Sequence, residues 1–430
     1  MKKNKFLKQV FILIIGGIFT KILGMVIRII TSRVMGKTGI GIYSFIMPTF
    51  MLGISISQIG FTSSISKLVA EEKKRSKKLI LGVIPISLGI NFLLLLFFVI
   101  FGKYISIYLL HDSRCTYGVM AIGFVLPFIS ISSILRGYFF GKERMGIHVI
   151  SNIFEDVIRI IFLVIFLPIF KSKSIESGVV ALILSNILSE LTSIFIFLIF
   201  LPKSKINIKD FLISHDDFKS IFSIGIPLTG SRIIGNIGGF LEPIILSFIL
   251  IKVGYSSSFI VEEYGVINGF VLPILLLPSF FSTAIAQAII PQVSKGYVNK
   301  MFNSIKRKIK LATFLSFFIG FCFTILVFLF PSVFLNFLYN TNDGVNYLRL
   351  LAPIFLFQYI QGPISASLQA MGKSRISFNA TLIGTIVKII CLVLFSLFKI
   401  GLYGLIIGFS LSILVTTFYE VKSIKKVLKY

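Results

Sequence analysis

Two basic residues stand inside the first long apolar segment of this sequence, where a membrane would surround them. Lys21 and Arg28 lie within residues 10–33, and a segment of roughly 20 apolar residues is long enough to cross a bilayer. A charge at the bilayer centre costs at least about 2.5–3.5 kcal/mol, and this segment has no acidic residue to offset it. Gly17, Lys21, Gly24 and Arg28 share one helical face. We therefore expect this face to line a water-filled cavity that receives something negative.

A later apolar segment repeats this arrangement. In residues 220–251, Arg232, Gly235 and Gly239 share one helical face, and the carboxylate of Glu242 is a candidate counter-ion for either arginine. The alternative interpretation is structural: the glycines pack helices together, and the cations reach the membrane surface along their own side chains. The candidate substrate-binding residues are Arg28, Arg232, Lys21 and Glu242.

The composition is that of an integral membrane protein. Hydrophobic residues make up 56% of the chain, charged residues only 14%, and the mean hydropathy is +0.98. The net charge of +27 does not indicate nucleic-acid binding, because the basic residues form short clusters between apolar segments. The sequence has no phosphate-binding loop, no metal-ligand cluster and no nucleophile–base motif. We expect no cofactor, no metal and no enzymatic activity.

The basic residues also predict the topology. We expect about twelve transmembrane helices, and the segments that connect them alternate in charge. Of the 43 Lys and Arg residues, 29 lie in the set of connections that includes both termini, and only 8 lie in the opposite set. By the positive-inside rule both termini are cytoplasmic, which requires an even number of spans. The sequence therefore predicts a multi-pass protein of the cell membrane.

The longest polar connection predicts how the chain is divided. It follows the sixth expected span, so we expect an all-α protein with a six-helix lobe at 1–201, a cytoplasmic link at 202–219 and a second six-helix lobe at 220–430. Because each lobe has an even number of spans, both lobes insert with the same orientation. That predicts a pseudo-twofold axis along the membrane normal.

An internal repeat supports the two lobes. Residues 159–166 read RIIFLVIF and residues 388–395 read KIICLVLF, which pairs Arg159 with Lys388. Similar turns precede the two octets, GKERMG at 141–146 and GKSRIS at 372–377.

Other charged residues and prolines lie inside the expected spans. Glu155 and Arg159 stand at i, i+4 and favour a structural ion pair, whereas the sequence assigns no partner to Glu190 or Lys388. Prolines in and beside the expected eighth span, residues 263–290, predict a kinked or broken helix.

Four segments carry a resemblance to a known family. Residues 20–48, 135–145, 264–294 and 367–374 resemble the stage V sporulation protein B group of polysaccharide-transport proteins. That group is similar to the lipid II flippase MurJ, within the multidrug/oligosaccharidyl-lipid/polysaccharide superfamily. The resemblance implies two six-helix lobes around a cationic cavity, alternating access and a polyprenyl-diphosphate-linked sugar as cargo. Set against MurJ, Lys21 stands where an arginine is expected and Arg28 where an aspartate is expected.

Three functions follow from these observations. The leading one is export of an anionic lipid-linked saccharide from the inner to the outer leaflet, with its diphosphate at the arginines. The second is a cation-coupled multidrug exporter, which would need acidic residues in the cavity. The third is a membrane scaffold for envelope assembly, which leaves the mid-membrane cations unexplained. The expected partners are the lipid-linked saccharide and membrane lipids, without nucleic acid, and we expect a monomer.

Overall fold

The computed structural model describes residues 2–71, 76–202 and 214–428, and every regular element in these residues is a helix. The chain divides by its internal contacts into unit 1, Met1–Ile244, and unit 2, Ile245–Tyr430, with the boundary inside α7. The elements that begin in unit 1 are α1 (Lys2–Gln58), α2 (Phe61–Glu71), α3 (Ser76–Tyr104), η1 (Ile105–Leu109), η2 (Ser113–Cys115), α4 (Thr116–Gly141), α5 (Met145–Lys173), α6 (Ile175–Phe200) and α7 (His215–Val253). Those of unit 2 are α8 (Ser257–Gly265), η4 (Val266–Val271), α9 (Leu272–Leu275), α10 (Ser279–Val298), α11 (Phe302–Leu329), α12 (Pro331–Tyr339), α13 (Val345–Ala370), α14 (Ser374–Ser396) and α15 (Tyr403–Val427).

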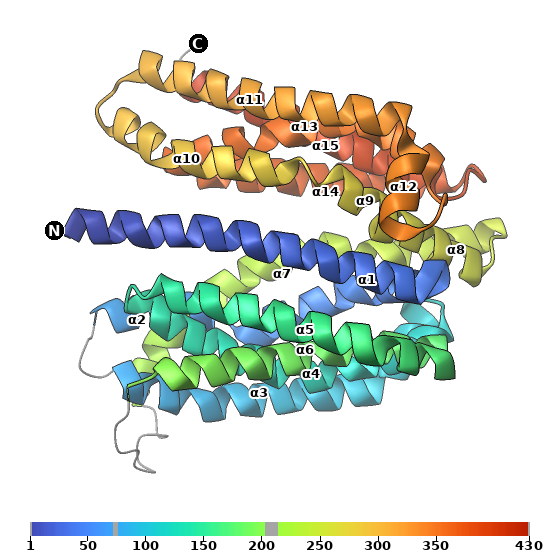
Figure 1. Ribbon diagram of the computed structural model, residues 1–430, viewed down its shortest axis with the longest axis horizontal. Coiled ribbons are helices and arrows are strands. Elements are labelled where there is room, and N and C mark those ends of the chain that lie inside the picture. The colour runs from blue at the N-terminus through green and yellow to red at the C-terminus, as the bar shows by residue number, and fades with distance from the viewer. Residues whose placement is uncertain (1, 72–75, 203–213, 429–430) are drawn as a thin grey trace. The chain divides into compact units, whose positions relative to one another are not determined.

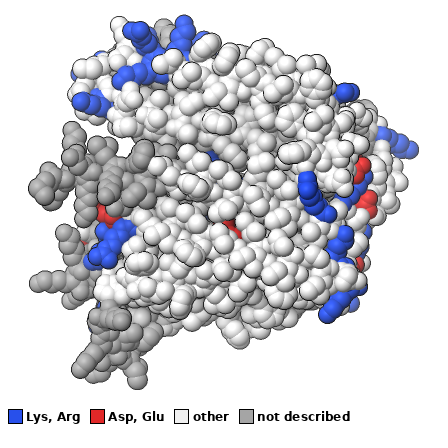
Figure 2. Space-filling model, viewed as in Figure 1, with Lys and Arg blue, Asp and Glu red and all other residues white. Residues whose placement is uncertain are grey.

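These helices confirm an all-helical, multi-pass membrane protein. In the described part of the chain, nine helical stretches are long and apolar enough to cross a bilayer. Figure 2 shows the same property on one face, where Lys and Arg gather toward the helix ends and a broad white band separates them. The helix α5, with 29 residues, is not among the nine, and it carries Glu155, Asp156 and Arg159.

The helix α1 is interrupted where the first expected span ends. Gly36 has the non-helical backbone angles φ 66° and ψ −172°, so the 57 residues of α1 are two helices joined at a kink. A second interruption lies inside the second expected span, residues 43–67. Ile59 and Gly60 have φ values of 42° and 63°, which stop α1 and allow α2 to start in a new direction.

Unit 1 is a bundle of closely packed helices. The pairs α3 with α4, α5 with α6, α4 with α6 and α1 with α5 run side by side in Figure 1. Fully buried Phe61, Phe139 and Phe197 belong to one apolar core. Glycine lets the backbones approach: a Cβ on Gly137 of α4 would lie 2.8 Å from the carbonyl oxygen of Thr62 in α2.

Unit 2 packs in a comparable way. Its closest pairs are α14 with α15, α11 with α13, α10 with α13 and α13 with α15. Tyr359 of α13 is fully buried, and its hydroxyl donates a 2.7 Å hydrogen bond to the carbonyl oxygen of Leu275. The chain from α8 to α10 is broken into short pieces around a π-helical turn, η4, which confirms the interrupted eighth helix that the prolines predicted.

The two units contain the same turn. After α4, the amides of residues 142, 143 and 144 donate to the carbonyls of 138, 140 and 139, and Glu143 has φ 56°. After α13, the amides of 371, 372 and 373 donate to the carbonyls of 367, 369 and 368, and Gly372 has φ 74°. The hydrogen bonds therefore align Glu143 with Gly372. Alignment of the Gly-Lys pairs in the sequence, residues 141–142 with 372–373, would instead shift this correspondence by two residues. The helices α5 and α14 begin directly after these turns, and Arg159 and Lys388 stand at the same position in them.

Candidate functional site

Two glycines on the basic stripe of α1 have room beside them. Arg28 is exposed and Lys21 is half-buried. A Cβ added to Gly17 or to Gly24 would meet no neighbouring atom within 4 Å. These two glycines are therefore not pressed against a neighbouring helix in the described structure, which removes helix packing as the reason for them here.

The stripe of α7 has the same character. Arg232 is exposed, and a Cβ added to Gly235 or Gly239 would again meet no atom within 4 Å. Each stripe thus combines an exposed guanidinium with glycines that leave the surface beside it unoccupied. Such a surface admits a bulky group next to the cation.

A close backbone contact sets the position of α7 on α1 within unit 1. A Cβ on Gly225 would lie 2.3 Å from the carbonyl oxygen of Ile59, and one on Gly60 would lie 2.9 Å from the carbonyl oxygen of Gly225. Only glycine fits at either position, and Gly60 also has a positive φ. The interruption between α1 and α2 is therefore the point against which α7 packs.

Two hydrogen bonds follow this contact along α7. The Nη1 atom of Arg232 donates to Oε1 of Gln58 over 3.1 Å. One turn later, Nδ2 of Asn236 donates to Oγ of Ser55 over 2.8 Å. Because a neutral amide accepts from Arg232, the guanidinium is oriented but keeps its full positive charge.

Glu242 is not the partner of Arg232 in the described structure. It is buried, with 4% of its surface exposed, and stands ten residues further along α7, which is about 15 Å at the rise of an α-helix. The hydrogen bond to Gln58 is the polar contact that the structure gives the guanidinium of Arg232 among the described residues. A ligand with negative charge would therefore meet a cation that no described carboxylate neutralises.

A second polar group lies between α4, α5 and α6. Ser132 donates a hydrogen bond to Oε2 of Glu190, which supplies a partner that the sequence did not assign. Glu190 and Glu155 both interact electrostatically with Arg136 and Arg159. Among the described residues, neither glutamate has a carboxylate oxygen within 4.0 Å of a basic nitrogen. The predicted ion pair between Glu155 and Arg159 is therefore wrong by this distance criterion. The Nε atoms of both arginines are buried without a hydrogen-bond partner.

Unit 2 places its own charged residues differently. The ammonium of Lys388 lies 4.9 Å from the ring centre of Phe409, a cation–π contact. Ser365 of α13 donates a 2.5 Å hydrogen bond to Oε1 of Glu420 in α15. Glu190 and Glu420 thus each accept a hydrogen bond from a serine of a neighbouring helix. When the units are aligned by Arg159 and Lys388, the two serines stand one helical turn apart.

Gln58, Asn236 and Ser55 are the site residues that sequence reasoning missed. They are uncharged, so nothing in an apolar segment distinguishes them from other small polar residues. A weak signal for this site was Gly60, a glycine inside an apolar segment, which can end a helix but is also common within helices.

The described residues include groups that suit the binding of anions. No three His, Cys, Asp or Glu side chains in this part of the chain gather in a way that could hold a metal ion. The exposed guanidiniums of Arg28 and Arg232 are donors that suit phosphate oxygens, because arginine binds them through two parallel hydrogen bonds.

Comparison with known proteins identifies the family of this chain. Residues 6–297 match the family described as "Polysaccharide biosynthesis protein", and residues 243–394 match the family described as "MatE". Stage V sporulation protein B of Bacillus subtilis (strain 168) is 32% identical over 440 residues, which cover 100% of this chain and 85% of that protein.

Two solved structures share the fold. An inward-facing MATE multidrug resistance transporter of the MOP superfamily superposes with a TM-score of 0.76 at 16% identity, over 95% of this chain and 94% of that one. The inward closed form of the lipid II flippase MurJ superposes with a TM-score of 0.73 at 17% identity, over 96% of this chain and 87% of that one. The chain therefore belongs to the polysaccharide biosynthesis protein family, and it shares the fold of these two membrane proteins.

Proposed function

We propose that this transporter moves an anionic, polyprenyl-diphosphate-linked saccharide from the inner to the outer leaflet of the cell membrane. Arg28 and Arg232 bind the diphosphate, with Lys21 as a further cation and Glu242 as an acid buried further along α7. MurJ, which shares this fold, is a flippase of lipid II, and this similarity supports a cargo of the same class for this chain.

The observation that carries this proposal is the pair of matched stripes. Arg28 and Arg232 are each exposed within a long apolar helix, and each is flanked by glycines beside which there is open space. An exposed guanidinium suits a diphosphate, because phosphate oxygens accept charge-assisted hydrogen bonds from arginine. The glycines leave room for the sugar that is attached to the diphosphate.

The proposal includes a topology of twelve spans with both termini in the cytoplasm. The kink at Gly36 divides α1 into two spans, and α5 and α13 cross the membrane although they are more polar than the nine apolar stretches. The lobes are residues 1–201 and 220–430, joined by the link 202–219, of which 203–213 lie outside the described residues. The shared turn at Glu143 and Gly372 supports a pseudo-twofold repeat of the two lobes along the membrane normal.

Transport then proceeds by alternating access of the two lobes. The broken stretch from α8 to α10 supplies backbone that can bend without unfolding a continuous helix. An inside-negative potential favours export of the anion by about 2.3 kcal/mol per charge per 100 mV.

The test is equilibrium binding to the purified protein. We expect a polyprenyl-diphosphate saccharide to bind, and a cationic dye not to bind. Arg28→Ala and Arg232→Ala should each weaken binding of the saccharide lipid by about tenfold or more, since each removes a charge-assisted contact worth about 1.5–3 kcal/mol.

Arg349→Ala is the matched control, because Arg349 is an exposed arginine near the start of another long helix, α13. It should bind like the unmodified protein. Binding of the cationic dye in place of the saccharide lipid would instead support a multidrug exporter and contradict the proposal.

A further inference from the structure

An open groove of about 1070 Å³ runs along the side of unit 1. Val99 of α3 and Phe162 and Phe170 of α5 line it on opposite sides, and its lining includes the small side chains of Ala121 in α4 and Ala181 in α6. The lining extends along α6 from Ser174 to Ile187, which is about 20 Å at 1.5 Å per residue. That is somewhat more than one leaflet of a hydrocarbon core about 30 Å thick.

The polar groups of the groove gather at one end. Ser113 and Arg114 precede α4, and Ser174, Glu176 and Ser177 stand at the start of α6, whereas the rest of the lining is apolar apart from the hydroxyl of Tyr117. A groove with this division has the amphipathic pattern of a membrane lipid. Its polar end lies where the helices end, at the level of lipid headgroups.

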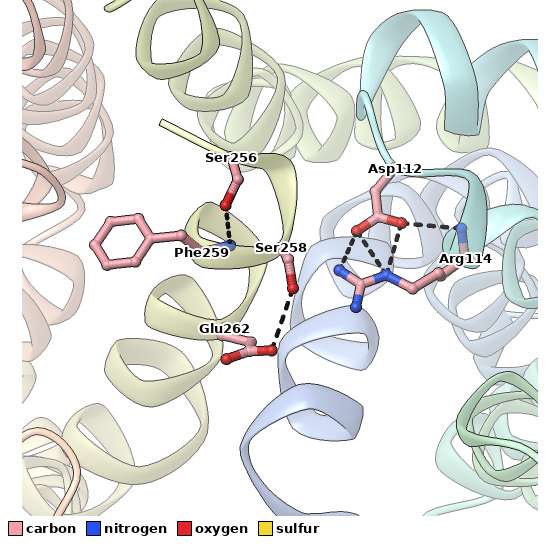
Figure 3. A network of polar contacts seen from close by, with 6 residues as sticks. All are labelled: Asp112, Arg114, Ser256, Ser258, Phe259 and Glu262. Carbon is pink, nitrogen blue, oxygen red and sulfur yellow. Dashed lines mark hydrogen bonds and ion pairs between the residues drawn. The ribbon is translucent and has the colours of Figure 1, made fainter. Parts of the chain in front are cut away.

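The cation at this end is held in place. In Figure 3, Nη2 of Arg114 lies 2.6 Å from Oδ2 of Asp112, and Nε lies 3.0 Å from Oδ1 and 3.1 Å from Oδ2 of the same carboxylate. Asp112 is 6% exposed, and its Oδ1 also accepts from the backbone amide of Arg114. The side chain of Arg114 is still 26% exposed, and it lines the mouth of the groove.

The anion at this end is Glu176, in the first turn of α6. It forms no ion pair within 4.0 Å with any residue that the structure describes. The mouth of the groove therefore presents two charged groups above a channel of apolar side chains: the guanidinium of Arg114, which is paired with the buried Asp112, and the carboxylate of Glu176.

We propose that this groove binds a zwitterionic aminophospholipid of the phosphatidylethanolamine type. Its phosphate contacts Arg114, its ammonium contacts Glu176, and its hydrocarbon chain lies over Ala121 and Ala181. A zwitterionic head matches both charges at once, whereas an anionic head would place its negative charge beside Glu176 without a partner. The site is separate from the stripes of α1 and α7, and its existence does not depend on which lipid the protein transports.

The test is lipid binding to the purified protein, measured by native mass spectrometry in competition between phosphatidylethanolamine, phosphatidylglycerol and phosphatidylcholine. We expect phosphatidylethanolamine to be retained preferentially. Phosphatidylcholine has the same charge but no N–H donors, so it reports whether the ammonium donates to Glu176.

Substitutions of two kinds separate binding of the lipid headgroup from binding of its hydrocarbon chain. Glu176→Gln should weaken retention of phosphatidylethanolamine about tenfold, and Glu176→Lys should shift the preference to phosphatidylglycerol. Ala181→Phe fills the channel and should lower retention of all three lipids, and Ala121→Leu is a milder substitution with the same purpose. Glu143→Gln, at the opposite end of α4, should leave binding unchanged.

Equal retention of the three lipids, unchanged by Glu176→Lys, would overturn the proposal, because the groove would then be filled by any surrounding lipid. Preference for phosphatidylglycerol by the unmodified protein would overturn it as well. A variant that elutes as an aggregate is replaced by the milder one, so that the comparison is always made on folded protein.

Discussion

Arg232 combines an exposed guanidinium with a fixed orientation. Its Nη1 donates to the amide oxygen of Gln58, while Asn236, one turn away, holds the same face of α7 on α1 through Ser55. Neutral partners hold the arginine in position without cancelling its charge. A cation prepared in this way loses little freedom when a phosphate binds, which favours affinity.

The buried carboxylate of Glu190 gives a prediction at the same scale. Glu190→Ala should lower the free energy of unfolding by about 1.5–3 kcal/mol, because it removes the bond from Ser132 and one of the carboxylates that interact with Arg136 and Arg159. The measurement is the melting temperature of the purified protein in detergent. Glu143→Gln, an exposed glutamate in the turn after α4, is the control and should melt like the unmodified protein. Equal melting temperatures for Glu190→Ala and the control would contradict this role.

Charges and glycines could be read from the sequence, but their partners could not. The spacing of Gly17, Lys21, Gly24 and Arg28 already placed them on one face, because a helix fixes that periodicity. The partner of Arg232, in contrast, lies 174 residues away in the chain and is an uncharged glutamine. Contacts over such a separation depend on how α7 packs at the Ile59–Gly60 interruption. No local sequence pattern predicts this packing.

At the scale of elements, close backbone contacts hold the helices of each unit. Gly137 brings α4 against α2, and Gly225 brings α7 against the end of α1. Small residues of this kind take the place of large apolar side chains, because burying apolar groups brings little advantage when the surrounding solvent is lipid.

Gly137→Ala should therefore destabilise the protein by about 1–3 kcal/mol, since its Cβ would lie 2.8 Å from a backbone oxygen that cannot rotate away. Gly89→Ala in α3 is the matched control: its Cβ would meet no atom within 4 Å, and alanine favours a helix over glycine by about 0.5–1 kcal/mol. We expect the first variant to melt below the unmodified protein and the second to melt at the same temperature or above it. The reverse order would show that these glycines do not set the helix spacing.

The expected elements were located well where apolar segments are long and uniform. The interruption of the eighth segment was predicted from its prolines, because proline removes a helical hydrogen bond. The interruption at Ile59–Gly60 was not, because a single glycine inside an apolar segment is common. The repeated turn was found from its Gly-Lys letters, but its hydrogen bonds align Glu143 with Gly372, since the left-handed residue and not the letters defines the turn.

At the scale of the whole molecule, the distribution of basic residues predicts the orientation in the membrane. It predicts that Lys171, at the end of α5, lies outside the cell and that Arg307, in α11, lies in the cytoplasm. The side of the membrane on which each position lies can be tested with single-cysteine variants. Cys115, Cys322 and Cys391 are first replaced, and one cysteine is then introduced at position 171 or 307. An impermeant thiol reagent added to intact cells should label position 171 and not position 307. Labelling of position 307 and not of position 171 would show that the topology is the opposite of the predicted one.

Composition and charge identify the class of the whole protein, but they do not identify its cargo. An all-helical membrane protein of this family follows from hydropathy and from the resemblance of four segments. Under the proposed function, neutral groups near Arg232, such as Asn236 and Ser55, would contact the saccharide, and amide and hydroxyl groups of this kind form hydrogen bonds with many sugars. That part of the function has to be measured.

The most direct measurement is translocation in proteoliposomes. A polyprenyl-diphosphate saccharide is placed in one leaflet, and its arrival in the other is followed with a membrane-impermeant enzyme that modifies the sugar. We predict translocation by the unmodified protein and by Arg349→Ala, and loss of it in Arg28→Ala and Arg232→Ala while both remain folded and inserted. Translocation at the unmodified rate by both of these alanine variants would contradict the role of the two arginines in binding the anionic cargo.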